Sequence, residues 1–280
     1  MTTTPDTPTT STRRGRRGLM IGAALAAVVL VGLVIWYVGR DAPAAVDTQA
    51  AVDAAGSGTA DQDADDGADE SGDGDADAGD DAGEDTAATP EAGARPSDWQ
   101  VVTDAVEYDL AEGTGTFIGF RIAEELTTVG DTEAVGRTPA VEGTVTLEDT
   151  TLVDAMIVGD LTELTTDIRQ RDGATQRALN TSTFPTTTFA LSEPVDLGAA
   201  PAVGETVSVE ADGELTLNGV TQPVTVTLDA VLLDGAADLL LTGSFPLTLA
   251  DHDLVAPSAP IVVSVADTAT VELQLYLDAA

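Results

Sequence analysis

The sequence predicts an all-β domain of antiparallel strands, arranged as a sandwich or a barrel, in its C-terminal part. From Trp99 onward apolar and polar residues alternate with a period of two, as in half-buried strands. Gly, Pro and Asp separate these short runs. Asn218-Gly219 lies between two alternating segments, and Asn-Gly favours a hairpin because a type I′ turn needs positive φ at both central residues.

The alternating runs define the expected strands in order along the chain. They cover residues 141–149, 151–158, 207–210, 214–217, 220–230, 238–245, 261–265 and 271–277. Residues 166–180 have no such alternation and predict a loop that contains a short helix.

The N-terminal part has the sequence pattern of a membrane anchor. Residues 1–18 are polar and end in a cluster of arginines, which predicts a cytoplasmic tail. Residues 19–38 are apolar and uncharged, and a helix of that length spans about 30 Å, the thickness of the hydrocarbon core. We therefore expect a single transmembrane anchor with the C-terminal domain outside the cytoplasm. A cleaved signal peptide is the alternative, but its apolar core is usually shorter, and Ala42-Pro43-Ala44 is a poor cleavage site.

A run of Asp, Ala, Gly and Thr separates this anchor from the domain. Residues 41–97 combine low hydrophobicity with many like charges, which predicts a disordered acidic linker. A flexible chain of this length has an end-to-end distance of about 45 Å, so the linker would hold the domain away from the bilayer. Residues 98–280 contain all five phenylalanines and form the predicted domain.

Charge and composition exclude several classes of function. The net charge is −38 and all eleven basic residues are arginines, so the chain repels phosphates and we expect no nucleic acid partner. The absence of cysteine excludes disulfides, thiolate metal sites and cysteine nucleophiles. His252 is the single histidine and falls in a predicted loop. With no acid/base pair and no Gly-rich phosphate loop, the sequence predicts no catalytic residue, metal site or cofactor.

Several motifs resemble the YceI-like family. Arg171-Asp172, Leu179, Phe184-Pro185 and Phe189 precede the segment 213–224, GELTLNGVTQPV, and match the family pattern of Arg-Asp, Leu, Phe-Pro and Phe before G-x-L-T-x-x-G-V-T-x-P-V. Trp99 and Phe245 also stand where that family has comparable residues. The resemblance implies an exported, lipocalin-like antiparallel β-barrel of about eight strands with one short helix. It also implies that a polyisoprenoid or related long apolar molecule binds in the lumen. Aromatic residues are few in this chain, so we expect a lumen that is narrower, or lined mainly by Leu, Val and Thr.

The candidate ligand-contacting residues are apolar side chains and one arginine. They are Phe117, Phe120, Phe184, Phe189, Leu215, Leu217 and Arg171. Each phenylalanine would either line a cavity or fill the core. Phe117 and Phe120 are three apart, so they cannot face the same side of one regular strand. Leu215 and Leu217 share one face, which serves the core or the lumen.

Arg171 has two interpretations. It could meet the polar head of a ligand or order a loop at the barrel mouth. The alternative, which we favour, is that it pins the predicted helix to the barrel rim through a carboxylate.

The predicted function is non-catalytic binding of a polyisoprenoid or other long-chain lipid by a bacterial, membrane-anchored, extracytoplasmic barrel. The alternative is a structural or interaction module of the cell envelope, with a filled barrel and no ligand. The two differ in the lumen, because the second requires bulky side chains and no continuous apolar cavity. The sequence leaves the oligomeric state open.

Overall fold

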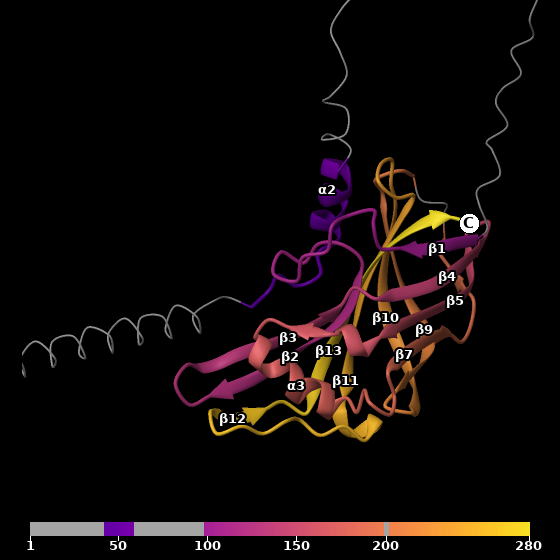
Figure 1. Cartoon of the computed structure of the whole chain (residues 1–280). Helices are drawn as coiled ribbons and strands as arrows, with labels where there is room; N and C mark the ends of the chain where they lie inside the picture. Colours follow the sequence, from indigo (N-terminus) through magenta and orange to yellow (C-terminus); the bar gives the residue numbers. More distant parts are fainter. Residues whose placement is uncertain (1–41, 59–97, 199–201) are drawn as a thin grey trace, which may run out of the picture. The chain divides into compact units, whose positions relative to one another are not determined.

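The computed structural model describes residues 42–58, 98–198 and 202–280 (Figure 1). The predicted tail at 1–18, the predicted anchor at 19–38 and residues 59–97 of the predicted linker lie outside these ranges. Within the described ranges, no helix is both long enough and apolar enough to cross a membrane.

Eight antiparallel strands of the described chain close into a barrel. In ring order they are β1 (Asp98–Val102), β4 (Val141–Glu148), β5 (Thr151–Asp160), β7 (Thr186–Leu191), β9 (Thr206–Leu217), β10 (Val220–Leu232), β11 (Leu239–Thr248) and β13 (Thr268–Ala279). The short strand β1 closes the ring, since Trp99 lies opposite Val145 of β4 on one side and Ala279 of β13 on the other. The predicted antiparallel barrel is confirmed, and this closing pair distinguishes it from a sandwich.

A second group of strands extends from the ring. It comprises β2 (Phe117–Leu126), β3 (Gly130–Thr138), β6 (Thr165–Thr166) and β12 (Val262–Val265), while β8 (Val195–Asp196) pairs with β5. One edge of β13 serves both groups, because residues 276–279 pair with β1 and residues 270–274 pair with β2. In Figure 1, β2 and β3 lie beside β13 as a long hairpin that leaves the barrel.

The sequence analysis missed β2 and β3 for a physical reason. Their outward face carries Arg121 and Arg137, and glycines at 119 and 136 interrupt both strands. The apolar–polar alternation that marks a strand at a solvated surface is therefore absent, although both strands pair over their full length.

The predicted hairpin and the predicted helix are both present. Asn218 and Gly219 have φ of 52° and 75°, as a type I′ turn requires, and Leu217 pairs with Val220 across the turn. The expected runs 207–210 and 214–217 belong to one strand, β9. The short helix expected within 166–180 is α3 (Arg169–Ala178).

Two short 3-10 helices, η1 (Leu161–Glu163) and η2 (Leu249–His252), complete the described elements of this part of the chain. His252, expected in a loop, lies in η2 and is buried. Its Nδ1 is 3.2 Å from the carbonyl oxygen of Val220, so it packs beneath the β9–β10 hairpin.

The prediction of a disordered linker over 41–97 is wrong for residues 42–58. This segment contains the helix α2 (Thr48–Gly58), and the Asp47 carboxylate caps its start by accepting from the backbone N–H of Ala50 at 2.8 Å. Ala51 and Ala55, one helical turn apart, are buried against Tyr276 and Leu240. The folded unit therefore begins at residue 42 rather than 98 and contains two α-helices in its described part rather than one. The prediction used the composition of residues 41–97 as a whole, which is acidic, so it did not detect the short stripe of alanines.

The hairpin turn yields a stability prediction with a matched control. A Cβ at Gly219 would lie 2.5 Å from the Phe184 ring, whereas a Cβ at Gly204 would meet nothing within 4 Å, and both glycines have positive φ. We expect Gly204→Ala to lower the free energy of unfolding by about 1 kcal/mol through backbone strain alone. Gly219→Ala should cost more, because the ring must also move.

Chemical denaturation of the two single variants, each with and without Phe184→Ala, checks this expectation. The extra cost at Gly219 should disappear when Phe184 is truncated, since the obstacle is then removed. If Gly204→Ala and Gly219→Ala lower the free energy of unfolding equally in the protein that keeps Phe184, the prediction is wrong.

Candidate functional site

The alternation of side chains along the ring strands gives the barrel an apolar inner face. On β13, Leu275 and Leu277 pack with Trp99 and Val145 of β1 and β4 and with Leu239 of β11, so they point into the barrel. The residues between them point outward. The same alternation runs through the neighbouring strands, because their residues pair in unbroken antiparallel register.

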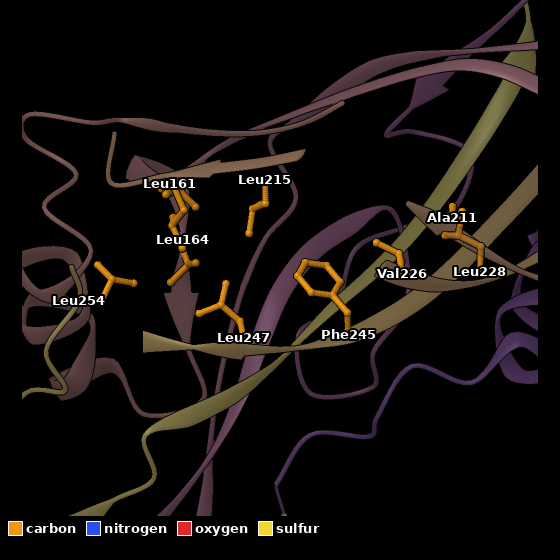
Figure 2. Close-up of a cluster of buried hydrophobic side chains, with 10 residues drawn as sticks. Leu161, Leu164, Ala211, Leu215, Val226, Leu228, Phe245, Leu247 and Leu254 are labelled. Atoms are coloured by element: carbon orange, nitrogen blue, oxygen red, sulfur yellow. The ribbon is translucent and has the colours of Figure 1, made fainter. Parts of the chain in front are cut away.

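Two buried apolar clusters fill the two ends of the lumen. The cluster shown in Figure 2 comprises Leu161, Leu164, Ala211, Leu215, Leu217, Val226, Leu228, Phe245, Leu247 and Leu254. In that view Phe245 lies between the group of Leu161, Leu164 and Leu247 and the group of Ala211, Val226 and Leu228. The second cluster surrounds Trp99 near β1.

Side chains between the two clusters are only partly buried. Leu191, Val195 and Leu273 pack against both clusters, so the apolar inner face is continuous from one end to the other. Leu273 is paired with β11 and β2 on its two sides, and the outward residues on either side of it, Glu272 and Gln274, are 3% and 1% exposed. Leu273, which packs against both clusters, therefore keeps part of its surface uncovered although its outward neighbours are buried.

Glycines on the inner face let aromatic rings lie along the barrel wall. A Cβ at Gly213 of β9 would be 2.3 Å from the ring of Phe189 on β7, and a Cβ at Gly136 of β3 would be 2.6 Å from the ring of Phe120 on β2. Each ring thus covers a glycine of a neighbouring strand, as aromatic side chains do when they shield a glycine in a sheet. Rings held against the wall leave more of the lumen for other molecules.

Polar atoms on the inner face are few, and one of them has no partner. The hydroxyls of Thr187 and Thr138 donate to the backbone carbonyls of Thr216 and Asp160 at 3.0 and 2.8 Å. The indole Nε1–H of Trp99 is buried and has no hydrogen-bond acceptor among the described residues. Those residues also include no cluster of three or more His, Asp or Glu side chains suited to a metal ion. The inner face can therefore bury apolar surface, while the free indole N–H of Trp99 is itself covered by the packed cluster around it.

Four of the predicted ligand-contacting residues meet at this inner face. Leu215 and Leu217 belong to the buried cluster of Figure 2, and Phe120 and Phe189 pack against it and remain partly exposed. Phe117 does not join them. It points outward, is fully buried, and lies beneath the guanidinium of Arg137, whose Cζ is 4.3 Å from the ring centroid. The spacing argument that only one residue of the pair Phe117 and Phe120 faces inward is confirmed.

The other two candidates lie away from the lumen clusters. Phe184 is exposed and lies over Gly219 at the tip of the β9–β10 hairpin. Arg171 in α3 donates to Glu124 of β2 at 2.5 Å and to Asp167 at 2.9 Å. Asp172 accepts from the backbone N–H of Thr166 at 2.8 Å. This arrangement matches the structural interpretation of Arg171, in which the arginine pins the helix to the sheet.

Sequence reasoning missed several lumen residues that the register now identifies. These are Ile157, Leu191, Val209, Leu241, Val271 and Leu273. The alternation within each predicted strand already placed some of them on an apolar face. It could not show which of the apolar residues remain accessible, because that depends on what lies across the barrel.

Comparisons with known proteins agree with this fold. A family model of the YceI-like domain matches residues 108–277. A polyisoprenoid binding domain from Saccharophagus degradans, implicated in plant cell wall breakdown, has 21% identity and a TM-score of 0.50. The match covers 66% of this chain and 100% of that one. BcnA of Burkholderia cenocepacia has 18% identity and a TM-score of 0.40, with coverage of 56% and 94%. A YceI protein of Campylobacter jejuni has 12% identity and a TM-score of 0.38, with coverage of 50% and 81%. No curated protein is significantly similar to the chain.

The ion pair at Arg171 yields a prediction of pH dependence. Burial raises the pKa of the Glu124 carboxyl above its ordinary value of 4.5, and the positive charge of Arg171 opposes this rise only in part. The folded protein therefore holds this proton more tightly than the unfolded chain. The stability that this group contributes is present below pH 4.5 and is lost as the pH rises through the raised pKa.

Glu124→Gln removes the cost of ionising the buried carboxyl. We expect the free energy of unfolding of the variant, relative to the unchanged protein, to rise between about pH 4.5 and neutrality. Burial also raises the pKa of Asp167, and this contribution remains in both proteins. Urea denaturation at several pH values measures the difference, and a difference that stays constant over this range would contradict the assignment.

Proposed function

We propose that this chain, which belongs to the YceI-like family, binds a polyisoprenoid or other long-chain apolar lipid in its barrel lumen and performs no catalysis. The observation that carries this proposal is the continuous apolar inner face that stays partly accessible between the two buried clusters. A lipid chain that buries about 400 Å² there gains on the order of 10 kcal/mol before the entropic costs of binding. The polyisoprenoid binding domain from Saccharophagus degradans, which has a similar fold, supports the choice of ligand class.

A membrane anchor completes the proposal. Residues 19–38 would hold the protein in the cell membrane, with the N-terminus in the cytoplasm and the barrel outside. A lipid-binding barrel in that position has access to its ligands from the bilayer. The strongly negative charge of the chain fits a neutral ligand better than an anionic one.

An envelope module with a filled barrel is the second candidate. The end of the barrel near β1 favours it, because Trp99, Val145 and Leu277 are all at most 4% exposed. The middle of the barrel favours the lipid binder, since Leu273 keeps its exposure there. The experiment that separates the two is a direct search for bound lipid.

Native mass spectrometry of the full chain, purified from a bacterial host and released from detergent in the instrument, should show a stoichiometric adduct of isoprenoid or fatty-chain mass. Organic extraction of the same sample identifies the adduct. A protein that carries no lipid and takes up no added polyprenol would favour the filled barrel instead.

A lumen-filling substitution tests where the ligand binds. Val224 of β10 faces the lumen and is partly buried, whereas Thr227 on the same strand faces outward and is exposed. Val224→Trp should lower polyprenol binding by about tenfold or more, because the indole occupies volume that the chain needs. Thr227→Trp should leave binding unchanged. Equal binding by both variants, with equal melting temperatures, would place the ligand elsewhere.

A further inference from the structure

The outward face of β13 is buried, unlike the outer face of most barrel strands. Glu272 is only 3% exposed and lies between two arginines. Its Oε1 accepts from Nε of Arg121 on β2 at 2.5 Å, and its Oε2 accepts from Arg137 on β3 at 2.9 Å. Arg137 has no exposed surface at all. Three charged groups are thus removed from water on the outside of the barrel, which is favourable only where their remaining donors are satisfied.

Residues 43–46 satisfy some of these donors. Nη2 of Arg121 donates to the carbonyl oxygen of Pro43, and Nη2 of Arg137 donates to the carbonyl oxygen of Ala44 at 2.6 Å. The backbone N–H of Val46 donates to Glu272 at 3.3 Å. The segment therefore binds the three charged side chains through its backbone, and hydrogen bonds to charged groups are among the stronger ones in proteins. Of the other donors, Nη1 of Arg121 donates to Glu133 at 2.6 Å and Nη1 of Arg137 donates to the carbonyl oxygen of Leu110 at 3.1 Å, while Nε of Arg137 has no acceptor among the described residues.

The helix α2 continues the same contact along the barrel. The hydroxyl of Thr48 donates to Asp229 of β10 at 3.0 Å and lies 2.7 Å from that of Thr242 on β11. Tyr276 of β13 donates its hydroxyl to the carbonyl oxygen of Ala51 at 2.7 Å. Figure 1 shows α2 beside the barrel near β13, far in sequence from the strands that it covers.

We infer that the outer face of β2, β3, β13, β11 and β10 is a docking surface for residues 42–58, and that these residues hold the barrel to the N-terminal region without help from the covalent link through residues 59–97. Polar contacts with the charged cluster and burial of the α2 alanines act together on one rigid surface. The acidic run then connects two parts of one folded unit and does not act as a spacer between anchor and domain.

This inference changes the expected distance between the barrel and the membrane, and on that point it rests on the proposed membrane anchor. The chain between residue 38 and residue 42 can extend at most about 14 Å, compared with about 45 Å for the spacer that the composition predicts. The docked segment thus brings the barrel close to the outer face of the membrane, where it can exchange lipid with the bilayer directly.

The test uses the full chain with an N-terminal affinity tag and a protease recognition sequence inserted between Gly72 and Asp73. After complete cleavage the N-terminal fragment is captured, and the fraction of the barrel fragment that stays with it is measured. We expect nearly all of the barrel fragment to stay bound. If the barrel fragment separates freely after cleavage of this protein, which carries no further substitution, the inference is wrong.

Two variants of adjacent alanines serve as a matched pair. Ala51 is buried against the barrel, whereas Ala50 is exposed on the same helix. Ala51→Glu should raise the rate of release at least about tenfold, because a charge then faces Tyr276 and Leu240. Ala50→Glu should release no faster than the unchanged protein. Circular dichroism of the released fragment verifies that the barrel stays folded, so that release reports undocking.

Membrane fractionation of the same samples separates this inference from the anchor. If the uncut protein is absent from the membrane fraction, the anchor is wrong, while capture by the tag still decides whether the segment docks. If the uncut protein is in the membrane but the cut barrel leaves it, the docking inference is wrong and the anchor stands.

Discussion

The strand β13 organises the molecule, because its two faces and its shared edge determine the positions of the other parts. One edge pairs with β11, and the other pairs with β1 and β2 in succession, so a single strand closes the ring and starts the extension. Its inward leucines form the lumen wall. Its outward Glu272 and Tyr276 bind the N-terminal segment. A shift of one residue in its register would exchange these two faces and place Glu272 among the lumen leucines, so both surfaces depend on the same pairing.

The lumen and the docking surface depend on different interactions, apolar burial in the first and hydrogen bonds to charged groups in the second. The lumen is apolar, has partly buried side chains between its two clusters and is almost without hydrogen-bonding groups, which suits a ligand that binds by burying surface. The docking surface concentrates two of the few arginines in a chain of net charge −38 around one buried glutamate. A buried cluster of this kind contributes specificity, because only a segment that presents carbonyl oxygens to Arg121 and Arg137 satisfies it. Two of the eleven arginines in the chain thus serve the attachment of one segment of the molecule to another.

The fold of residues 42–58 changes the interpretation of the acidic run. Composition averaged over residues 41–97 predicts one uniform linker, yet residues 42–58 fold as part of the barrel. Ala51 and Ala55 have the spacing of a helical stripe, and Asp47 is a good N-cap, so local signals were present. A stripe of alanine is weak without a partner surface, and isolated helices of this length are marginal in water. The outer face of the barrel, assembled mainly from strands more than a hundred residues away, provides the partner surface for this helix.

The sequence by itself determined the local geometry. Period-two alternation gave most strands, Asn218-Gly219 determined the hairpin turn, and the break in alternation located α3, because each depends on neighbouring residues alone. The tertiary structure decided the ring closure by β1, the pairing of β2 and β3, and the division of the phenylalanines between lumen and outer face. Phe117 and Phe120 illustrate the difference. Their spacing showed that they face opposite ways, but only the pairing of β2 with β13 showed that Phe120 faces the lumen, because a strand has two faces and its partners determine which one is inside.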